Sequence, residues 1–536
     1  MKLSQSSLEF ARAHIEAFWD SDFFPKPDVY QAIWAKWPEV CHLLTTRNAE
    51  NFARTGGRQL PAPKSRGGFR IVHQLDPLSA IVYTALAHKI CGAVESARVP
   101  VSERTVLSYR IAPDQAGFFA RGNGYAEFVE LCRELAHQYP FVLACDIAEF
   151  YNRIYLHRVQ NNVESCGQRD AANCLESFLL KLNLKASQGI PVGPAASIVI
   201  SEAALIDVDQ FVARTGLRYV RYVDDLRIFA DNAEALRATL EELVGYLFEA
   251  HRLQLAWGKT EVTSSADFVA RYLDAPHRIE QRELLGVAQS VADYGDTFVE
   301  MNSDELVQKF MDVDQPLTEE KNELRDILAF WLSAEERERR LVRDHALARL
   351  LKIATDSTPF DLGLARYVLR RGRSLNVADL FPVVLDRFDT LAPAAPDVFL
   401  FLEKVGAAEV LEVHRARLVA LSSGPGVRRS RFVQHWLQWF YTSSEHLLKE
   451  PDIRRYVYQQ ASAEFQARAA HKLRDLAWLR QRKSELAHMG PWDRWSTVLA
   501  SRVMAREERR AWLQSVVTGD SDSVDRLLVE WVVAQP

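Results

Sequence analysis

The stretch LRYVRYVDDLRIFAD (217–231) limits the folds open to this chain more than any other part of it. Two runs rich in β-branched, aromatic and other apolar residues flank a short turn that contains Asp224 and Asp225. This pattern predicts a β-hairpin whose bend presents two adjacent carboxylates. Like charges side by side repel each other, and a divalent cation is the usual compensation. Taken alone, an Asp-Asp pair is also typical of a solvated turn.

A third carboxylate lies at the end of an apolar run. The segment FVLACDI (141–147) predicts a buried strand with Asp146 near its end. A carboxylate in such a place is costly unless it binds a cation or a strong donor. Hard oxygen ligands suit Mg²⁺, and a pair of such ions serves nucleotidyl transfer. We therefore predict that Asp146, Asp224 and Asp225 bind two Mg²⁺ ions, for which Mn²⁺ can substitute.

The chain changes character near residue 290. Before it, helical patterns alternate with strand-like runs, and after it short amphipathic helices follow one another. One of these helices is expected to begin at Thr358-Pro359 and to end at Gly372. Helices of this length joined by short loops favour a stacked array. We predict an N-terminal helical extension (1–40), an α+β region (41–290) and an all-α, HEAT-like repeat region (291–536).

Composition narrows the class of protein. The 536 residues are 48% hydrophobic and 26% charged, as expected for a globular chain. The net charge of −5 argues against a polybasic nucleic-acid binder but leaves a local basic cleft open. No apolar run reaches 18 residues, and the charged N-terminus does not resemble a signal peptide. The six cysteines form no CxxC pair, so a zinc site has no support. We expect a cytoplasmic protein with no membrane partner.

Several motifs occur in the order found in a reverse-transcriptase palm. YVDD at 222–225 resembles the metal-binding hairpin, DIAEFY at 146–151 the strand with the first metal-binding Asp, SQGIPVGPAAS at 187–197 the Gln-Gly loop, and WGKT at 257–260 the later lysine motif. Upstream, PKSRGGFRIVHQLDPLSAIVYTAL (63–86) resembles the fingers hairpin that holds the incoming triphosphate. The resemblance covers about residues 40 to 290. It implies the α+β palm and fingers of a right-hand polymerase.

The resemblance also implies a role for each matching residue. The metals would be held by Asp146, Asp224 and Asp225 together with the carbonyl of Ile147. The implied nucleotide-binding residues are Lys64, Arg70, Tyr151, Gln188, Gly189 and Lys259. Tyr151 would pack under the sugar and exclude a 2′-hydroxyl, which favours deoxynucleotides. The alternative is that Tyr151 is a core aromatic and that Phe150 faces the site. Lys259 either protonates the leaving pyrophosphate or only neutralises its charge.

A palm joined to a long helical region resembles the abortive-infection (Abi) reverse transcriptases of bacterial antiphage defence. No second acidic set like that of RNase H is legible after residue 290, and FVARYLDAP (268–276) matches a primer grip poorly. The resemblance implies a DNA polymerase that adds dNTPs without a template and primes from a protein tyrosine. It also implies a homo-oligomer, from trimer to hexamer. The candidate priming residues are Tyr30, Tyr441, Tyr456 and Tyr458.

Two other functions stay open. The chain could be a conventional RNA-templated reverse transcriptase of retron or intron type, or a non-catalytic helical scaffold that keeps a polymerase-like palm for binding. Aromatic residues in the helical region bear on assembly, because those left at the surface would favour a closed homo-oligomer. These residues are Trp331, Trp436, Trp439, Phe440, Trp478, Trp492 and Trp495.

Overall fold

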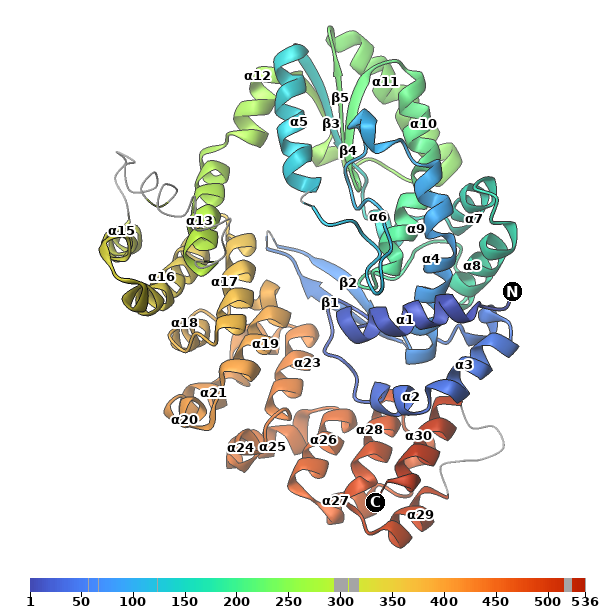
Figure 1. Ribbon diagram of the computed structural model, residues 1–536, viewed down its shortest axis with the longest axis vertical. Helices are drawn as coiled ribbons and strands as arrows, with labels where there is room; N and C mark the ends of the chain where they lie inside the picture. Colours follow the sequence, from blue (N-terminus) through green and yellow to red (C-terminus); the bar gives the residue numbers. More distant parts are fainter. Residues whose placement is uncertain are drawn as a thin grey trace. The chain divides into compact units, whose positions relative to one another are not determined.

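The computed structural model describes residues 1–55, 57–65, 67–122, 124–293, 307, 318–514 and 523–535 (Figure 1). The chain divides into two compact units. Unit 1 comprises Met1–Lys26, Tyr30–Gln59 and Val72–Ala275, and unit 2 comprises Pro27–Val29, Leu60–Ile71 and Pro276–Pro536. The borders predicted after residues 40 and 290 stay predictions.

Unit 1 is built on a four-stranded antiparallel sheet in the order β4-β5-β3-β6. Its strands are β3 (Phe141–Asp146), β4 (Arg218–Tyr222), β5 (Asp225–Ala230) and β6 (Glu261–Ser264). β3 lies inside the sheet, and its residues 142–145 are at most 1% exposed. A strand that is covered on both faces needs an apolar run rather than an alternating pattern, which is what FVLAC supplies. The predicted strand and the predicted hairpin are both confirmed.

Helices cover the sheet. Phe128, Leu131 and Leu135 of α5 (Gly124–Gln138) share a core cluster with Val142 and Phe229 of the strands. On α11 (Ala233–Tyr246), which contacts β3, β5 and β6, Leu236 and Leu243 are fully buried. The end of β3 at Asp146 and the start of β5 at Asp225 lie at one edge of this core.

The other helices of unit 1 lie before, between and after the sheet strands in the chain. They are α1 (Gln5–Phe18), α2 (Tyr30–Ala35), α3 (Trp37–Thr46), α4 (Pro77–Ala97), α6 (Phe150–Arg153), α7 (Leu156–Ser165), α8 (Arg169–Leu182), α9 (Ala196–Ala204), α10 (Ile206–Arg214) and α12 (Ser265–Phe268). Among the described helices, α4 is long and apolar enough to cross a membrane, but 78% of the relevant window is buried inside the protein. Its burial is that of a core helix, capped at its start by the side chain of Asp76.

A separate two-stranded hairpin consists of β1 (Arg58–Pro63) and β2 (Phe69–Gln74). It occupies the place where the sequence predicts the fingers hairpin. The end of β2 is bound to the loop before α9, since the His73 amide donates to the Val192 carbonyl (2.8 Å) and the Val192 amide donates to His73 Nδ1 (3.0 Å). Burial lowers the pKa of His73 to about 4, so the imidazole stays neutral and can accept this bond.

From Pro276 onward the described residues contain helices and no strand. The longer ones are α13 (Pro276–Ala292), α15 (Glu319–Ser333), α16 (Glu336–Asp356), α17 (Leu362–Leu375), α19 (Ala395–Val405), α23 (Arg431–Tyr441), α25 (Pro451–Gln460), α26 (Ala463–Leu473), α28 (Pro491–Ala500), α29 (Arg506–Leu513) and α30 (Ser523–Ala534). The shorter ones are α18 (Leu380–Asp386), α20 (Ala408–Val413), α21 (Arg415–Leu421), α22 (Pro425–Arg428), α24 (Glu445–Lys449) and α27 (Leu476–Gln481). Many of these helices pack on the next or the next but one along the chain. The predicted all-α character is confirmed, and the HEAT-like label stays a prediction.

One helix boundary differs from the prediction. α17 begins at Leu362 rather than at Thr358-Pro359, because the side chain of Asp361 caps it by accepting from the Leu364 amide. It ends at Leu375, where Asn376 adopts a left-handed φ of 58°. Gly372 stays inside the helix, and a Cβ there would meet Leu380 Cδ1 at 2.2 Å. The glycine therefore allows close helix packing rather than chain reversal.

The aromatic residues expected at the surface of the helical region are mostly core. Five are buried, namely Trp331, Trp436, Phe440, Trp478 and Trp495, and Trp439 and Trp492 are half-buried. Large apolar side chains gain most free energy when they leave water, and the helical core already takes up these rings. Most of the seven are thus core residues, and the homo-oligomer stays a prediction.

Candidate active site

The end of β3 and the β4–β5 turn bring the three aspartates together. In the β3–β5 register Asp146 lies opposite Asp225, and the Ile147 amide donates to the Asp224 carbonyl at 3.2 Å. The turn itself has two residues, Val223 and Asp224. Backbone pairing thus fixes carboxylates that lie 78 residues apart in the chain.

Two of the carboxylates are matched by cations of the chain itself. Lys259 Nζ lies 2.9 Å from Asp146 Oδ2, and Arg227 Nη2 lies 3.3 Å from Asp225 Oδ1. The Arg227 guanidinium also lies 5.8 Å from the ring centroids of Phe128 and Phe268, which hold it against the core. The prediction that Lys259 belongs to this site agrees with its contact to Asp146.

Asp224 differs from its neighbours, because among the described residues it forms no ion pair with a basic side chain. Burial, together with the nearby charges of Asp146 and Asp225, raises the pKa of Asp224 to about 6, against a smaller opposing effect of Lys259. The three carboxylates at this edge therefore carry more negative charge than Lys259 and Arg227 neutralise.

The donor chemistry of this site fits a divalent cation. Carboxylate oxygens are the ligands that Mg²⁺ prefers, and the excess negative charge at Asp224 is what such an ion would compensate. In the described part of the chain, however, no three His, Cys, Asp or Glu side chains converge as a ready ligand cluster. Asp225 is instead turned toward Arg227. The metal roles of Asp146, Asp224, Asp225 and the Ile147 carbonyl stay predictions.

Tyr151 lies on the short helix α6, next to the carboxylates. The Ser201 hydroxyl donates to the Tyr151 hydroxyl at 3.4 Å. Burial raises the pKa of Tyr151, and the nearby charges, that of Glu202 first, add to the effect. Phe150 is only 2% exposed, whereas Tyr151 is half-buried. Of the two aromatics, Tyr151 is therefore the one available to a substrate.

The predicted Gln-Gly loop is bound to the same helix. The Ile190 amide donates to the Tyr151 carbonyl at 2.9 Å, and the Gly189 amide donates to the Ile154 carbonyl at 2.9 Å. Gly189 has a φ of 92°, and a Cβ there would lie 3.0 Å from the Asn152 carbonyl oxygen. Both the backbone conformation and the close approach therefore require glycine. The side chain of Gln188 is exposed, so it is free to meet a ligand.

Lys64 and Arg70 lie on the β1–β2 hairpin and are both exposed. The hairpin between Leu60 and Ile71 groups with unit 2, so the nucleotide-binding roles of Lys64 and Arg70 stay predictions.

Sequence reasoning did not single out Trp257. Its side chain is 93% exposed on the turn that carries Lys259. The Ala256 amide holds this turn to the end of β3 by donating to the Asp146 carbonyl at 2.7 Å. The signal was visible in the sequence as a tryptophan inside the WGKT motif.

Three of the four candidate priming tyrosines are buried. Tyr30 is 1% exposed with its hydroxyl 3.2 Å from Asp20 Oδ2, and Tyr441 is fully buried with its hydroxyl 2.5 Å from the Leu418 carbonyl oxygen. A priming hydroxyl must reach an α-phosphate, so Tyr30 and Tyr441 are corrected from candidates to core residues. Tyr456 is also buried, at 8% exposed. Tyr458 is half-buried and donates to Asp475 at 3.1 Å.

Comparison with known proteins identifies the central segment. Residues 84–289 match the family described as reverse transcriptase (RNA-dependent DNA polymerase), a segment shorter than half of the chain. It includes the three aspartates, Tyr151, the Gln-Gly loop and Lys259. This part of the chain is a reverse-transcriptase domain with the corresponding palm-and-fingers fold. No curated protein matches the sequence.

Solved structures similar to this chain include two telomerases. Telomerase from Candida albicans, in complex with a fragment of telomeric RNA, is 13% identical with a TM-score of 0.29, and the match covers 72% of this chain and 66% of that one. Apo telomerase from Candida tropicalis is 10% identical with a TM-score of 0.32, and the match covers 76% of this chain and 72% of that one. The chain therefore spans just under two thirds of the first of these proteins.

The raised pKa of Asp224 predicts a pH-dependent effect of Asp224→Asn on stability without metal. At pH 7 the buried ionised carboxyl opposes folding, so the variant is expected to melt at a higher temperature than the natural protein. As the pH falls through about 6 toward about 4, native Asp224 binds a proton before the unfolded chain does, and this advantage fades. Thermal melts in EDTA between pH 4 and 8 measure the difference.

The control is Asp231→Asn, because Asp231 is an exposed residue directly after β5. Its melting curve should run parallel to that of the natural protein. An advantage of Asp224→Asn that stays constant down to pH 4 would contradict the burial of that charge.

Proposed function

We propose that this chain is a DNA polymerase that adds dNTPs by metal-assisted nucleotidyl transfer. The observation that carries the proposal is the grouping of Asp146, Asp224 and Lys259 at the edge of the sheet in a reverse-transcriptase domain, with Tyr151 on the helix that follows β3. Asp146 and Asp224, with Asp225, would hold Mg²⁺ or Mn²⁺. When bound, Mg²⁺ supplies the positive charge that activates an attacking hydroxyl and stabilises the leaving pyrophosphate.

The chain's own residues supply orientation and charge. Tyr151 would restrict the sugar with its ring, and Gly189 lets the backbone of the adjoining loop approach closely. Lys259 holds a positive charge at Asp146 from a short turn that leaves its side chain 67% exposed. These groups favour a deoxynucleoside triphosphate as the substrate.

The finer proposal is that synthesis is untemplated, is primed from a tyrosine and serves phage defence in the bacterial cytoplasm, in a homo-oligomer without a membrane partner. Its support is the resemblance of the motif order, followed by a long helical region, to abortive-infection reverse transcriptases. With Tyr30 and Tyr441 in the core, Tyr458 is the better placed of the four named residues. RNA-templated synthesis is the second candidate, since the matching family is described as RNA-dependent.

The metal assignment is tested by the double variant Asp224→Ala, Asp225→Ala. Labelled dNTP incorporation with Mg²⁺ or Mn²⁺ is expected to fall below detection, because the remaining carboxylate cannot hold the ions. Circular dichroism should show unchanged secondary structure, since both residues lie at the hairpin bend. Asp231→Ala is the matched control and should retain activity. Near-normal incorporation by the double variant would refute the assignment, and an inactive natural protein would favour the scaffold alternative.

Sugar discrimination is tested by Tyr151→Ala. The ratio of kcat/KM for dNTP over NTP is expected to fall at least about tenfold, equivalent to roughly 1.4 kcal/mol, because the ring no longer excludes the 2′-hydroxyl. Tyr151→Phe keeps the ring and loses only the contact to Ser201, so it should keep the discrimination. A ratio unchanged in Tyr151→Ala would show that another side chain is the gate.

Template use and priming are separated by one experiment. The purified protein is incubated with labelled dNTP and Mg²⁺, either alone or with a primed RNA template. Untemplated, protein-primed synthesis should give label without nucleic acid, and the label should stay on the protein in boiling detergent until protease is added. Label that appears only with primed RNA, as free DNA, would instead establish the templated reaction. Loss of attached label in Tyr458→Phe alone would identify the priming residue.

A further inference from the structure

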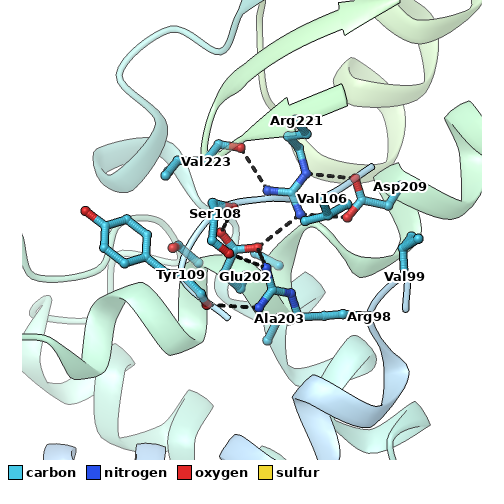
Figure 2. A network of polar contacts seen from close by, with 12 residues as sticks. Arg98, Val99, Val106, Ser108, Tyr109, Glu202, Ala203, Asp209, Arg221 and Val223 are labelled. Atoms are coloured by element: carbon cyan, nitrogen blue, oxygen red, sulfur yellow. Dashed lines mark hydrogen bonds and ion pairs between the residues drawn. The ribbon is translucent and has the colours of Figure 1, made fainter. Parts of the chain in front are cut away.

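A buried ionic network lies directly behind the β4–β5 turn (Figure 2). It consists of Arg98, Glu202, Asp209 and Arg221, of which each is at most 3% exposed. Burying four charges is costly, and here two cations balance two anions. The sequence motifs of the palm include none of the four. Such a network needs a reason beyond packing, because well-packed apolar side chains often stabilise a core as well or better.

Arg221 makes the contacts that connect the network to the turn. Its Nε and Nη2 donate to the two oxygens of Asp209 at 2.7 and 2.6 Å, and Nη2 also lies 3.0 Å from Glu202 Oε2. The remaining nitrogen, Nη1, donates to the Val223 carbonyl at 2.9 Å. The planar guanidinium thus has one edge fixed by a carboxylate and another directed at the backbone of the turn.

Glu202 and Arg98 hold this arrangement from the other side. Glu202 accepts from the Ser108 hydroxyl at 2.6 Å and lies 2.8 Å from Arg98 Nη2. Arg98 donates to the carbonyls of Ser108 (2.7 Å) and Tyr109 (3.0 Å). The network therefore connects the chain after α4, helices α9 and α10, and strand β4. Glu202 also follows Ser201, the residue that contacts Tyr151.

The turn that receives the Arg221 bond is strained. Val223 has a φ of 56°, a left-handed value that is rare for a β-branched residue and that glycine would adopt more readily. The Val223 carbonyl belongs to the peptide that joins Val223 to Asp224. A bond to this carbonyl opposes rotation of the peptide and so fixes the backbone from which the Asp224 side chain projects.

We propose that Arg221 is a positioning residue, which holds the Val223–Asp224 peptide and with it the place of Asp224 at the bend of the hairpin, and that Glu202, Asp209 and Arg98 hold the Arg221 guanidinium in place. The inference deepens the proposed function, on which its catalytic consequence rests. Its structural content concerns only the turn and is independent of whether the chain polymerises DNA.

The test compares Arg221→Lys with a matched control, Arg158→Lys. Lysine keeps the charge but cannot donate to Asp209 and to Val223 in the fork geometry of arginine. Arg158 forms a partly buried ion pair with Asp207 on a different face of α10, away from the turn. Both variants lose a multiply bonded arginine in unit 1, so the control accounts for a general loss of stability.

Three measurements are made on the full chain. Hydrogen exchange of a peptide that spans Tyr222–Asp225 should quicken at least about tenfold in Arg221→Lys and stay as in the natural protein in Arg158→Lys. Binding of Mn²⁺, followed by the loss of the free-ion paramagnetic resonance signal, should weaken only in Arg221→Lys. In dNTP incorporation, kcat should fall while KM stays within about twofold, as expected when the reacting groups rather than the substrate contacts are displaced.

The outcomes separate the two proposals. Unchanged exchange at Tyr222–Asp225 in a folded Arg221→Lys protein would overturn the positioning role, whatever its melting temperature. If the natural protein incorporates no dNTP, the proposed function fails, while exchange and Mn²⁺ binding still decide the role of Arg221. Should Arg221→Lys not fold, Glu202→Gln decides, because it removes one charge that holds the guanidinium. Faster exchange at the turn in that variant supports the proposal, and unchanged exchange overturns it.

Discussion

The antiparallel pairing of β3 with β5 is the constraint on which the rest of unit 1 depends. It sets Asp146 opposite Asp225, and the Ile147 amide extends the pairing to the Asp224 carbonyl. A slip of one residue in this register would move every side chain of β3 to the opposite face of the sheet. Close packing on both faces opposes such a slip, because it would exchange side chains of different size between the two buried faces of residues 142–145. Hydrophobic burial at the centre of the sheet therefore determines where Asp146, Asp224 and Asp225 lie at its edge.

Charge balance follows from the same placement. Lys259 matches Asp146 and Arg227 matches Asp225, whereas Asp224 is left in a negative environment that raises its pKa. On the opposite side of the hairpin, Arg221 and Arg98 are matched by Asp209 and Glu202. The buried network is thus neutral by itself, while the adjoining carboxylate edge is not. This contrast distinguishes a group of charges that supports the turn from one that is suited to bind a cation.

The sequence predicted the features that depend on local pattern. Apolar runs around Asp224 and Asp225 predicted the hairpin, and the order of motifs predicted the palm, because each signal lies within a few neighbouring residues. The partners of Arg221 lie 12 and 19 residues earlier in the chain on separate helices, so only the fold brings them together. In the sequence, the only indication of this ionic network was a charged residue, Arg221, between the apolar Val220 and Tyr222 of a predicted strand. The burial of single aromatic residues could not be predicted from local pattern either. Nothing near Tyr30, Tyr441 or Trp436 in the sequence distinguishes a surface residue from a core residue, and all three are at most 1% exposed.

The exposure of Trp257 affects the intrinsic fluorescence of the protein. Its indole is 93% exposed, whereas Trp331, Trp436 and Trp495 are at most 1% exposed. Indole emission shifts to longer wavelength in water, so Trp257 contributes at the red edge of the spectrum and is open to collisional quenchers. Its turn is bonded to the backbone of Asp146 and carries Lys259. The intrinsic fluorescence of the natural chain therefore contains a signal from beside the carboxylates, and occupancy of that edge can be followed without a label or a reaction.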